Sequence, residues 1–234
     1  MKIHTILHAS FETAGSIENW AYENSHSLDI THSYLNQPLP NINDFDFLII
    51  MGGPQSPREQ DIYPYLTNEI SLIKDAIKAN KYILGFCLGA QLIGEALGAV
   101  TLKSPEKEVG IWPITLTEDG KNDPLFEGFG DTFDVIHWHN DMPGIPEGSV
   151  IIASSPGCPH QAFRYNKRVY GLQFHMEFTQ DNAKTMCDCC PDDLKPSKFT
   201  QSKEDILTSD LLSINQKLNL ILNRFTNTNS LVTT

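Results

Sequence analysis

The chain has 234 residues, of which 40% are hydrophobic and 20% charged, so it can bury a substantial core. Its 17 Lys and Arg against 29 Asp and Glu give a net charge of −12, which disfavours nucleic acid and anionic lipid as partners. The apolar runs are far shorter than a membrane span, no export signal precedes the first strand, and five cysteines without a leader indicate reduced thiols. These features predict a soluble, cytoplasmic protein.

Apolar strands alternate with amphipathic helices in the first half of the chain, which is typical of a mainly parallel sheet covered on both faces. The expected strands there are 2–9, 27–34, 46–51 and 82–86, and the expected helices are 15–24, 62–79 and 88–97. The second half has a more antiparallel pattern, with expected strands at 109–117, 133–139, 150–154, 162–165 and 169–174. One domain over 1–234 is expected, with a core at 1–180, a connector at 181–201 and a C-terminal helix at 202–226.

The segment Gly85-Phe86-Cys87-Leu88-Gly89 lies between an expected strand and an expected helix, as in the thiol form of a nucleophile elbow. Flanking glycines permit the sharp turn that lifts the side chain above the sheet. A helix N-terminus lowers the pKa of a thiol there, and the amide of Leu88 stays free to face a developing oxyanion. The segment predicts a nucleophilic Cys87; the alternative is a buried structural cysteine between packing glycines.

A later strand ends in Gln173-Phe174-His175-Met176-Glu177. Side chains two residues apart in an extended chain point the same way, so His175 and Glu177 share one side. A histidine beside a thiol can act as base and acid, and a carboxylate can hold its tautomer. A turn at Gly52-Gly53-Pro54 follows another strand, at the edge where α/β proteins place their sites.

Taken in order, these three motifs resemble the class I, or triad-type, glutamine amidotransferases. The resemblance runs from the first strand to beyond Glu177, and the segment 155–163 is also similar to the free-standing subgroup related to the amidotransferase domain of GMP synthase. It implies an α/β fold: a flavodoxin-like three-layer αβα arrangement with a mainly parallel central sheet and a small additional antiparallel β element.

The resemblance implies a Cys87–His175–Glu177 triad, in which Cys87 attacks the γ-carboxamide of glutamine, ammonia leaves, and water resolves a γ-glutamyl thioester to glutamate. His175 matches the general base and acid, and Glu177 the residue that orients it. The implied oxyanion hole and substrate pocket comprise the backbone amides of Gly53 and Leu88 together with Gly52, Gln91 and His139. No metal ion or organic cofactor is expected.

Two features depart from the family pattern. Met176 stands where a proline is usual, and we expect it to face away from the triad. No Gly-rich phosphate loop of an ATP-pyrophosphatase is present, so no attached synthase is expected. Three functions stay open: a glutaminase that passes ammonia to an unidentified synthase partner, a γ-glutamyl peptidase or hydrolase, and a non-catalytic binding or regulatory protein. The intact triad argues against the third. The oligomeric state is not predicted.

Two other patterns suggest metal or redox chemistry but are better explained otherwise. The run His137-Trp138-His139-Asn140-Asp141 could present three ligands, yet His139 more plausibly lines the glutamine pocket. Cys187, Cys189 and Cys190 have no second Cys/His pair at zinc spacing, and we interpret them as packing residues at the end of a helix.

Overall fold

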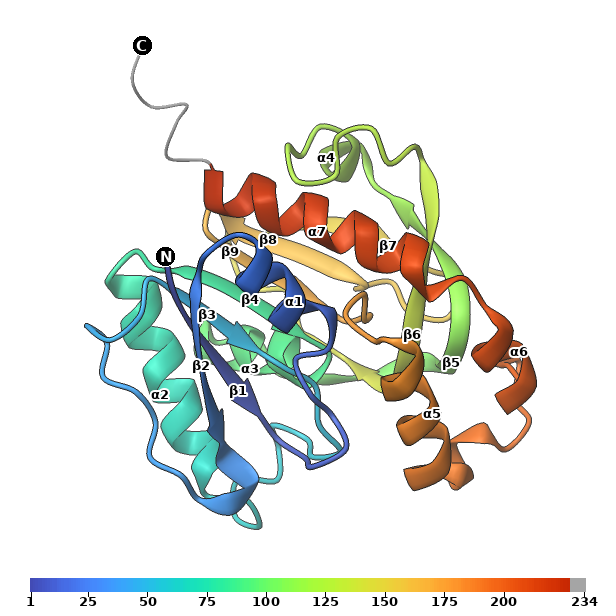
Figure 1. Ribbon diagram of the computed structural model, residues 1–234, viewed down its shortest axis with the longest axis horizontal. Coiled ribbons are helices and arrows are strands. Elements are labelled where there is room, and N and C mark those ends of the chain that lie inside the picture. Colours follow the sequence, from blue (N-terminus) through green and yellow to red (C-terminus); the bar gives the residue numbers. More distant parts are fainter. Residues whose placement is uncertain (228–234) are drawn as a thin grey trace.

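The computed structural model describes residues 1–227 and shows a mixed sheet with helices packed against it (Figure 1). The strand order is β10-β5-β7-β8-β9-β4-β3-β1-β2, and β6 pairs with β5 outside this path. From β2 to β9 neighbouring strands are parallel, whereas β8, β7, β5 and β6 join in antiparallel fashion. The strands are β1 (Lys2–Leu7), β2 (Ser27–His32), β3 (Phe47–Ile50), β4 (Tyr82–Phe86), β5 (Leu102–Leu116), β6 (Thr132–Met142), β7 (Val150–Ser154), β8 (Ala162–Asn166), β9 (Val169–Leu172) and β10 (Phe199–Thr200).

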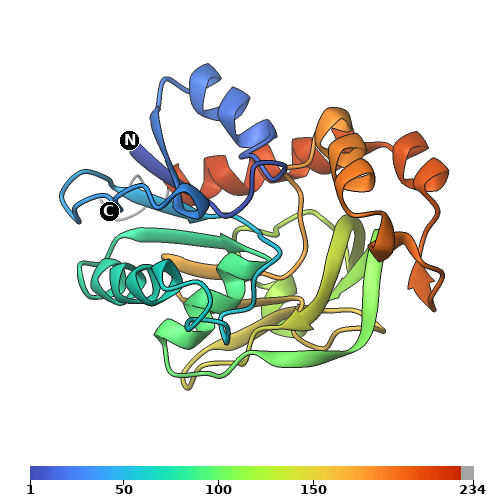
Figure 2. The same ribbon diagram turned by 90° about the horizontal axis from the view of Figure 1, so that it is seen from below.

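Helices cover both faces of the sheet (Figures 1 and 2). On one face, α2 and α3 pack over Leu48, Ile50 and Ile83, and on the other, α1 and α7 pack over Phe47 and Ile49. Two sets of alternating side chains therefore form two cores, as a doubly covered sheet requires. The helices are α1 (Ser16–Glu23), α2 (Tyr65–Lys78), α3 (Leu88–Ala96), α4 (Glu118–Lys121), α5 (Gln180–Cys189), α6 (Lys203–Thr208) and α7 (Leu211–Asn227), with 3-10 turns η1 (Ser33–Leu35) and η2 (Pro191–Leu194).

The α/β class and the covered, partly parallel sheet are confirmed, with differences in detail. The antiparallel strands, expected as a small additional element, continue the same sheet beyond β9. Helix α2 begins three residues later than expected because Pro64 lacks an N–H and suits only a helix start. The segment 181–201, expected as a connector, contains most of α5, which a Thr179–Asn182 capping box initiates.

The C-terminal helix expected over 202–226 is two helices rather than one. Ser209 is extended and ends α6, and Asp210 Oδ1 accepts a hydrogen bond from the Ser213 amide at the start of α7. Capping by Asp210 supplies an acceptor for an amide that has no partner within the helix, which favours a new start over continuation. The apolar stripe spans this break because both helices face the same core.

Helix α7 is an integral part of the fold. Phe225 is fully buried, and its ring lies 5.2 Å from those of Phe47 and Tyr82 and 5.4 Å from that of Tyr170, each in an edge-to-face arrangement. Trp20 of α1 donates a hydrogen bond of 2.8 Å to Asn223. The end of α7 therefore joins α1 to strands β3, β4 and β9.

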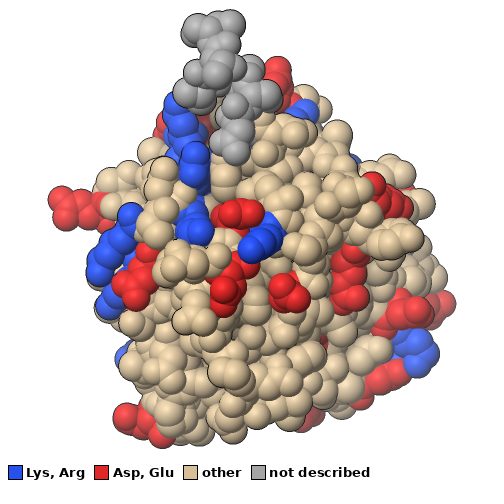
Figure 3. Space-filling model, turned by 60° about the vertical axis from the view of Figure 1, so that its left-hand side comes forward, with Lys and Arg blue, Asp and Glu red and all other residues tan. Residues whose placement is uncertain are grey.

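Within residues 1–227, no helix is long and apolar enough to cross a bilayer. On the face drawn in Figure 3, basic side chains gather toward one side, with acidic side chains beside and among them.

We expect Phe225→Ala to lower the free energy of unfolding by about 3–5 kcal/mol, because it leaves a cavity among three aromatic rings. Leu212→Ala is the matched control on the same helix, since Leu212 is 66% exposed. Urea unfolding of both variants checks the prediction, and equal, small effects would show that α7 is not part of the core.

Candidate active site

A cavity of about 330 Å³ opens at the carboxyl ends of the central parallel strands. Its walls come from the segments that follow β1, β3, β4 and β9, from β5 and β6, and from the region of α5 and η2. The residues that line it include six with a polar side-chain group: Glu12, Cys87, Gln91, Trp138, His139 and His175.

Cys87 occupies a strained turn between β4 and α3. Its φ of 49° and ψ of −107° lie outside the regions that residues with a Cβ prefer, and it forms the N-cap of α3. The turn is tight because α3 lies directly on β3: a Cβ at Gly89 would come within 2.1 Å of the Ile50 carbonyl oxygen. The Cys87 amide donates to Leu172 O of β9 at 2.8 Å, which fixes the turn from its other side.

His175 and Glu177 form a buried pair beside Cys87. His175 Nδ1 lies 2.6 Å from Glu177 Oε1, and the other carboxylate oxygen accepts the Met176 amide at 2.9 Å. Burial alone lowers the pKa of His175, but Glu177 and a hydrogen bond with Cys87 outweigh it and hold that pKa well above its ordinary value. The arrangement favours a protonated imidazole next to the Cys87 sulfur.

The backbone around His175 is held by hydrogen bonds from β6 and from α7. His175 exchanges two backbone hydrogen bonds with Ile136 of β6, at 2.7 and 3.0 Å. Asn215 of α7 donates from its side chain to the carbonyls of Met176 and Phe178, at 2.7 and 3.1 Å. Met176 is fully buried in the core and takes no part in lining the cavity, as expected from its position.

The first turn of α1 braces the same loop. The Ser16 amide donates to Glu177 O at 2.9 Å. Gly15, which precedes Ser16, has a φ of +56°, and a Cβ on it would lie 2.2 Å from that same oxygen. Only glycine allows α1 to approach Glu177 this closely, and neither α1 nor α7 had been linked to the site by sequence.

The turn after β3 is set by a buried ion pair that sequence reasoning missed. His8 Nε2 lies 2.8 Å from Glu69 Oε2, and both side chains are fully buried. Burial lowers the pKa of His8, yet Glu69 raises it more, so the ring can donate from both nitrogens. Its Nδ1 lies 3.1 Å from the Gly52 carbonyl oxygen. Because a trans peptide aims its N–H opposite to its C=O, the Gly53 N–H points away from His8.

The other expected site residues lie around this centre. Gln91 lines the cavity, and its side-chain amide donates to Gln173 Oε1 at 3.0 Å. His139 and Gly53 also line the cavity, and Leu88 follows Cys87 at the first position of α3. A Cβ on Gly52 would lie 2.8 Å from His175 Cε1 and 3.5 Å from Cys87 Cβ, so this turn lies against both side chains.

Glu12 is a second carboxyl group at the site that sequence reasoning missed. It is 7% exposed, lines the cavity, and its Oε2 would lie 2.4 Å from a Cβ on Gly52. Burial raises the pKa of Glu12 from 4.5 to about 7, against the opposing effects of His175 and His8. Its place after β1, whose carboxyl end borders the site, is the signal that could have identified it.

The sequence run 137–141 does not act as one ligand set. Asp141 lines the cavity and pairs with Lys103 at 3.1 Å, whereas His137 and His139 face Glu108 of β5. Glu108, His137 and His139 are the one group in residues 1–227 whose donor atoms converge as metal ligands could. The clustered cysteines 187, 189 and 190 are free thiols, and burial raises the pKa of Cys187 and of Cys190, the latter to about 11.

We expect Glu12→Gln to raise the free energy of unfolding relative to wild type, and to do so more at pH 8 than at pH 5. The folded chain keeps its proton on Glu12 up to about pH 7, while the unfolded chain loses it near pH 4.5, so stability falls as pH rises through this window. The full shift corresponds to roughly 3 kcal/mol, which the amide variant does not lose. Thermal unfolding from pH 4.5 to 8 measures the difference, with exposed Glu18→Gln as control. Parallel curves for wild type and Glu12→Gln would contradict the prediction.

Comparison with known proteins agrees with this geometry. The profile of the family "Glutamine amidotransferase class-I" matches residues 11–187. The glutamine amidotransferase-like protein YfeJ of Salmonella typhimurium is 40% identical over 97% of this chain and 98% of its own length. The crystal structure of a glutamine amido transferase from Methylobacillus flagellatus superposes with a TM-score of 0.90 at 25% identity, over 96% of this chain and 94% of that one.

The GMP synthase of Thermosipho africanus is 38% identical over 56% of this chain, but the matched part is 24% of that enzyme's length. The similarity therefore concerns one part of a larger protein, and the activity of the rest is not transferred by it. With a matching profile over most of its length and a cysteine elbow at the expected strand–helix turn, the chain belongs to the class I glutamine amidotransferase family.

Proposed function

We propose that the protein is a cysteine-dependent glutaminase that hydrolyses the γ-carboxamide of glutamine to glutamate and ammonia through a γ-glutamyl thioester on Cys87. The observation that carries this proposal is the geometry of one corner of the cavity. There a strained cysteine at a helix N-terminus adjoins a histidine that a buried carboxylate holds at 2.6 Å.

In the proposed reaction, the Cys87 thiolate attacks the amide carbon and the carbonyl oxygen becomes an oxyanion. The backbone N–H groups of Gly53 and Leu88 stabilise that oxyanion, and the His8 contact with the Gly52 carbonyl keeps the first of them in place. His175 gives its proton to the departing nitrogen, so that ammonia leaves and the thioester forms. It then takes a proton from water, which attacks the thioester and releases glutamate and the thiolate.

Glu177 supports both proton transfers. It accepts from Nδ1, so the proton that His175 exchanges is the one on Nε2. Two hydrogen bonds keep the Glu177 carboxylate from turning away. The Met176 N–H donates to its second carboxylate oxygen, and the Ser16 N–H donates to its backbone carbonyl. In the proposal Gly52, Gln91 and His139 contact the substrate.

A second candidate function is hydrolysis of γ-glutamyl peptides by the same triad. The cavity volume of about 330 Å³ is within the range of about 300–1,000 Å³ that drug-sized ligands use, which leaves room for a leaving group larger than ammonia. Lys103 and Lys107 also line the cavity and could face the carboxylate of such a leaving group. A non-catalytic role on the same fold is disfavoured by the intact triad.

The proposed function also implies a partner protein and a cellular location. Ammonia produced at Cys87 would pass to a synthase partner, by analogy with the GMP synthase relatives, and a thiol nucleophile that must stay reduced suits a cytoplasmic location. No cofactor takes part in the proposed chemistry.

We expect Cys87→Ala to abolish turnover, by a factor of at least about 10⁴, without changing the fold, because the alanine cannot form the thioester. The assay measures ammonia and glutamate from L-glutamine, with a panel of γ-glutamyl peptides in parallel. Cys189→Ala, which removes an exposed free thiol, is the matched control. Activity that survives in Cys87→Ala would refute the thioester route.

If neither substrate is turned over, a glutamine-like diazoketone separates an idle enzyme from an inactive fold. Covalent labelling at Cys87, found by mass spectrometry, would show a competent nucleophile that awaits a partner. Absence of labelling in the folded wild type would favour the non-catalytic alternative.

We also expect Glu177→Gln to lose less activity than His175→Ala, since orienting the base matters less than the base itself. Because the charge of Glu177 raises the pKa of His175, the imidazolium of the glutamine variant should lose its proton at lower pH, and the alkaline limb of the rate profile should move to lower pH with it. Rate profiles of kcat/KM against pH for both variants check this. Equal losses, with no shift of the limb, would mean that Glu177 does more than orient and charge the ring.

A further inference from the structure

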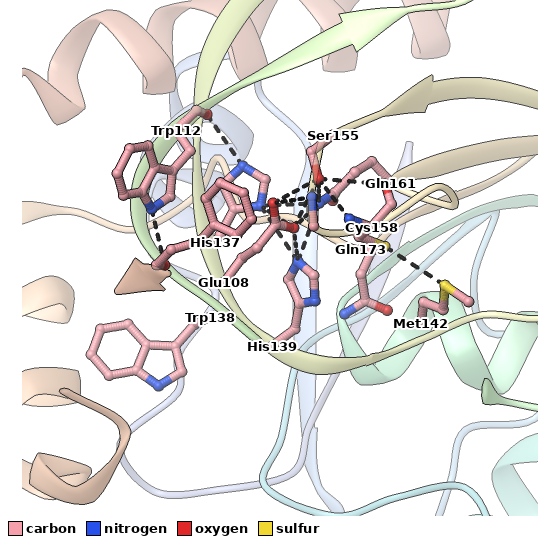
Figure 4. Close-up of polar contacts among 12 residues, drawn as sticks. Glu108, Trp112, His137, Trp138, His139, Met142, Ser155, Cys158, Gln161 and Gln173 are labelled. Carbon is pink, nitrogen blue, oxygen red and sulfur yellow. Dashed lines mark hydrogen bonds and ion pairs between the residues drawn. The ribbon is translucent and has the colours of Figure 1, made fainter. Parts of the chain in front are cut away.

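Behind the cavity wall, four side chains from two strands and a loop converge on one point (Figure 4). His137 and His139 lie on β6, Glu108 lies on β5, and Gln161 immediately precedes β8. All four side chains are buried. The proposed glutaminase chemistry uses none of Glu108, His137 and Gln161.

The facing atoms have the spacing of a tetrahedral ligand set. His137 Nδ1 and His139 Nε2 are 3.4 Å apart, and they lie 3.6 and 3.3 Å from Glu108 Oε2. Ligand atoms about 2.0–2.1 Å from a tetrahedral zinc ion lie about 3.3–3.4 Å from one another. The triangle therefore has nearly the edge lengths of one face of such a tetrahedron.

The carboxamide of Gln161 occupies the fourth corner. Its Nε2 lies 2.6 Å from Glu108 Oε2, 3.1 Å from His137 Nδ1 and 3.3 Å from His139 Nε2. Its Oε1 is buried and has no hydrogen-bond partner in the described part of the chain. Rotation of the carboxamide by half a turn would exchange these atoms and present an oxygen ligand at that corner.

The contacts behind these atoms are those that metal ligands need. His137 Nε2 donates to the Trp112 carbonyl at 3.2 Å, which leaves a lone pair on Nδ1 facing the centre. Glu108 Oε1 accepts from Ser155 Oγ at 2.7 Å and from the Gly157 amide at 3.2 Å, which fixes the carboxylate. Its Oε2 faces the two imidazoles and accepts from Ser155 Oγ at 2.9 Å and from Gln161 Nε2 at 2.6 Å, and an ion would take the place of the second of these contacts. His139 borders the cavity, which offers an ion a path from solvent.

We propose that Glu108, His137 and His139 bind one divalent cation of the Zn²⁺ class, with the Gln161 carboxamide oxygen as the fourth ligand. Two imidazoles and two oxygens suit a borderline cation rather than Mg²⁺ or Ca²⁺, which prefer more oxygen ligands. The sequence did not indicate this site because Asp141, the third residue of the apparent motif, is not a ligand and Glu108 lies on another strand.

The ion would fix β6 against the triad rather than take part in the reaction. Trp138, between the two histidine ligands, has its carbonyl 3.8 Å from Cys87 Sγ, and Ile136 bonds to both backbone groups of His175. Binding to the folded state alone raises its stability in proportion to the logarithm of ion concentration.

Zinc content and affinity test the site directly. The protein carries Cys87→Ala, so that the reactive thiol cannot bind the ion, and it is stripped with chelator before titration with Zn²⁺ or with Co²⁺ as a spectroscopic probe. We expect one ion per chain, the intense visible bands of tetrahedral Co²⁺, and a melting temperature that rises with Zn²⁺. Adding Glu108→Gln or His137→Ala should weaken Zn²⁺ binding by at least about tenfold, because losing a residue that only supports a ligand already costs about that much. His32→Ala, on β2 at the far edge of the sheet, should bind as the parent does.

Gln161→Glu keeps the test valid if the other variants fail to fold. A carboxylate at the fourth corner should tighten Zn²⁺ binding and enlarge the zinc-dependent rise in melting temperature. The proposal is overturned if the parent binds no Zn²⁺, if Glu108→Gln and His137→Ala bind it equally well, or if Gln161→Glu is destabilised without recovery in Zn²⁺. Those results would identify a purely hydrogen-bonded network centred on the Gln161 amide.

Discussion

The site depends on the close approach of α3 to β3, which forces the backbone at Cys87 into a conformation that side chains with a Cβ avoid. With 2.1 Å between a Cβ at position 89 and the Ile50 carbonyl oxygen, α3 could not lie where it does if residue 89 were not glycine. The resulting turn presents the sulfur at the helix N-terminus, at the edge where β4 and β9 both end. The neighbouring strand β9 then leads into His175, so Cys87 and His175 meet because their strands are adjacent and parallel.

Buried charge at the site is arranged in pairs, and the exception is informative. His175 pairs with Glu177 and His8 with Glu69, each within 2.8 Å, so that the cost of burying each charge is offset by its partner. Glu12 lies between these pairs with no ion-pair partner among the described residues, and burial raises its pKa to about 7. A carboxyl group that titrates near neutral pH beside His175 makes the charge of the cavity depend on pH, which a substrate bearing an ammonium group would sense.

Much of this could be predicted because the informative residues are close in sequence or lie in recurrent motifs. The strand–turn–helix around Cys87 and the pair two residues apart at 175 and 177 are local patterns, and β4 and β7 have the bounds expected for them. The residues that were missed act across the fold: Asn215 reaches the catalytic loop from 37 to 39 residues away, and His8 meets Glu69 across 61. Such contacts depend on the order of strands and the placing of helices, and the periodic pattern of apolar residues within one segment does not contain that information. The break at Asp210 was missed for the opposite reason, since one capping side chain interrupts an otherwise continuous apolar stripe.

The chemistry that separates Cys87 from the other four cysteines lies in its surroundings rather than in the thiol. Burial raises the pKa of Cys158 to about 12 and that of Cys190 to about 11, so at neutral pH both stay protonated and poorly nucleophilic. Cys87 is also buried, but it stands at a helix N-terminus, in hydrogen-bond contact with a histidine whose own pKa is held well above its ordinary value. The same strand order that brings His175 to Cys87 therefore sets this cysteine apart from Cys158 and Cys190 through the histidine beside it.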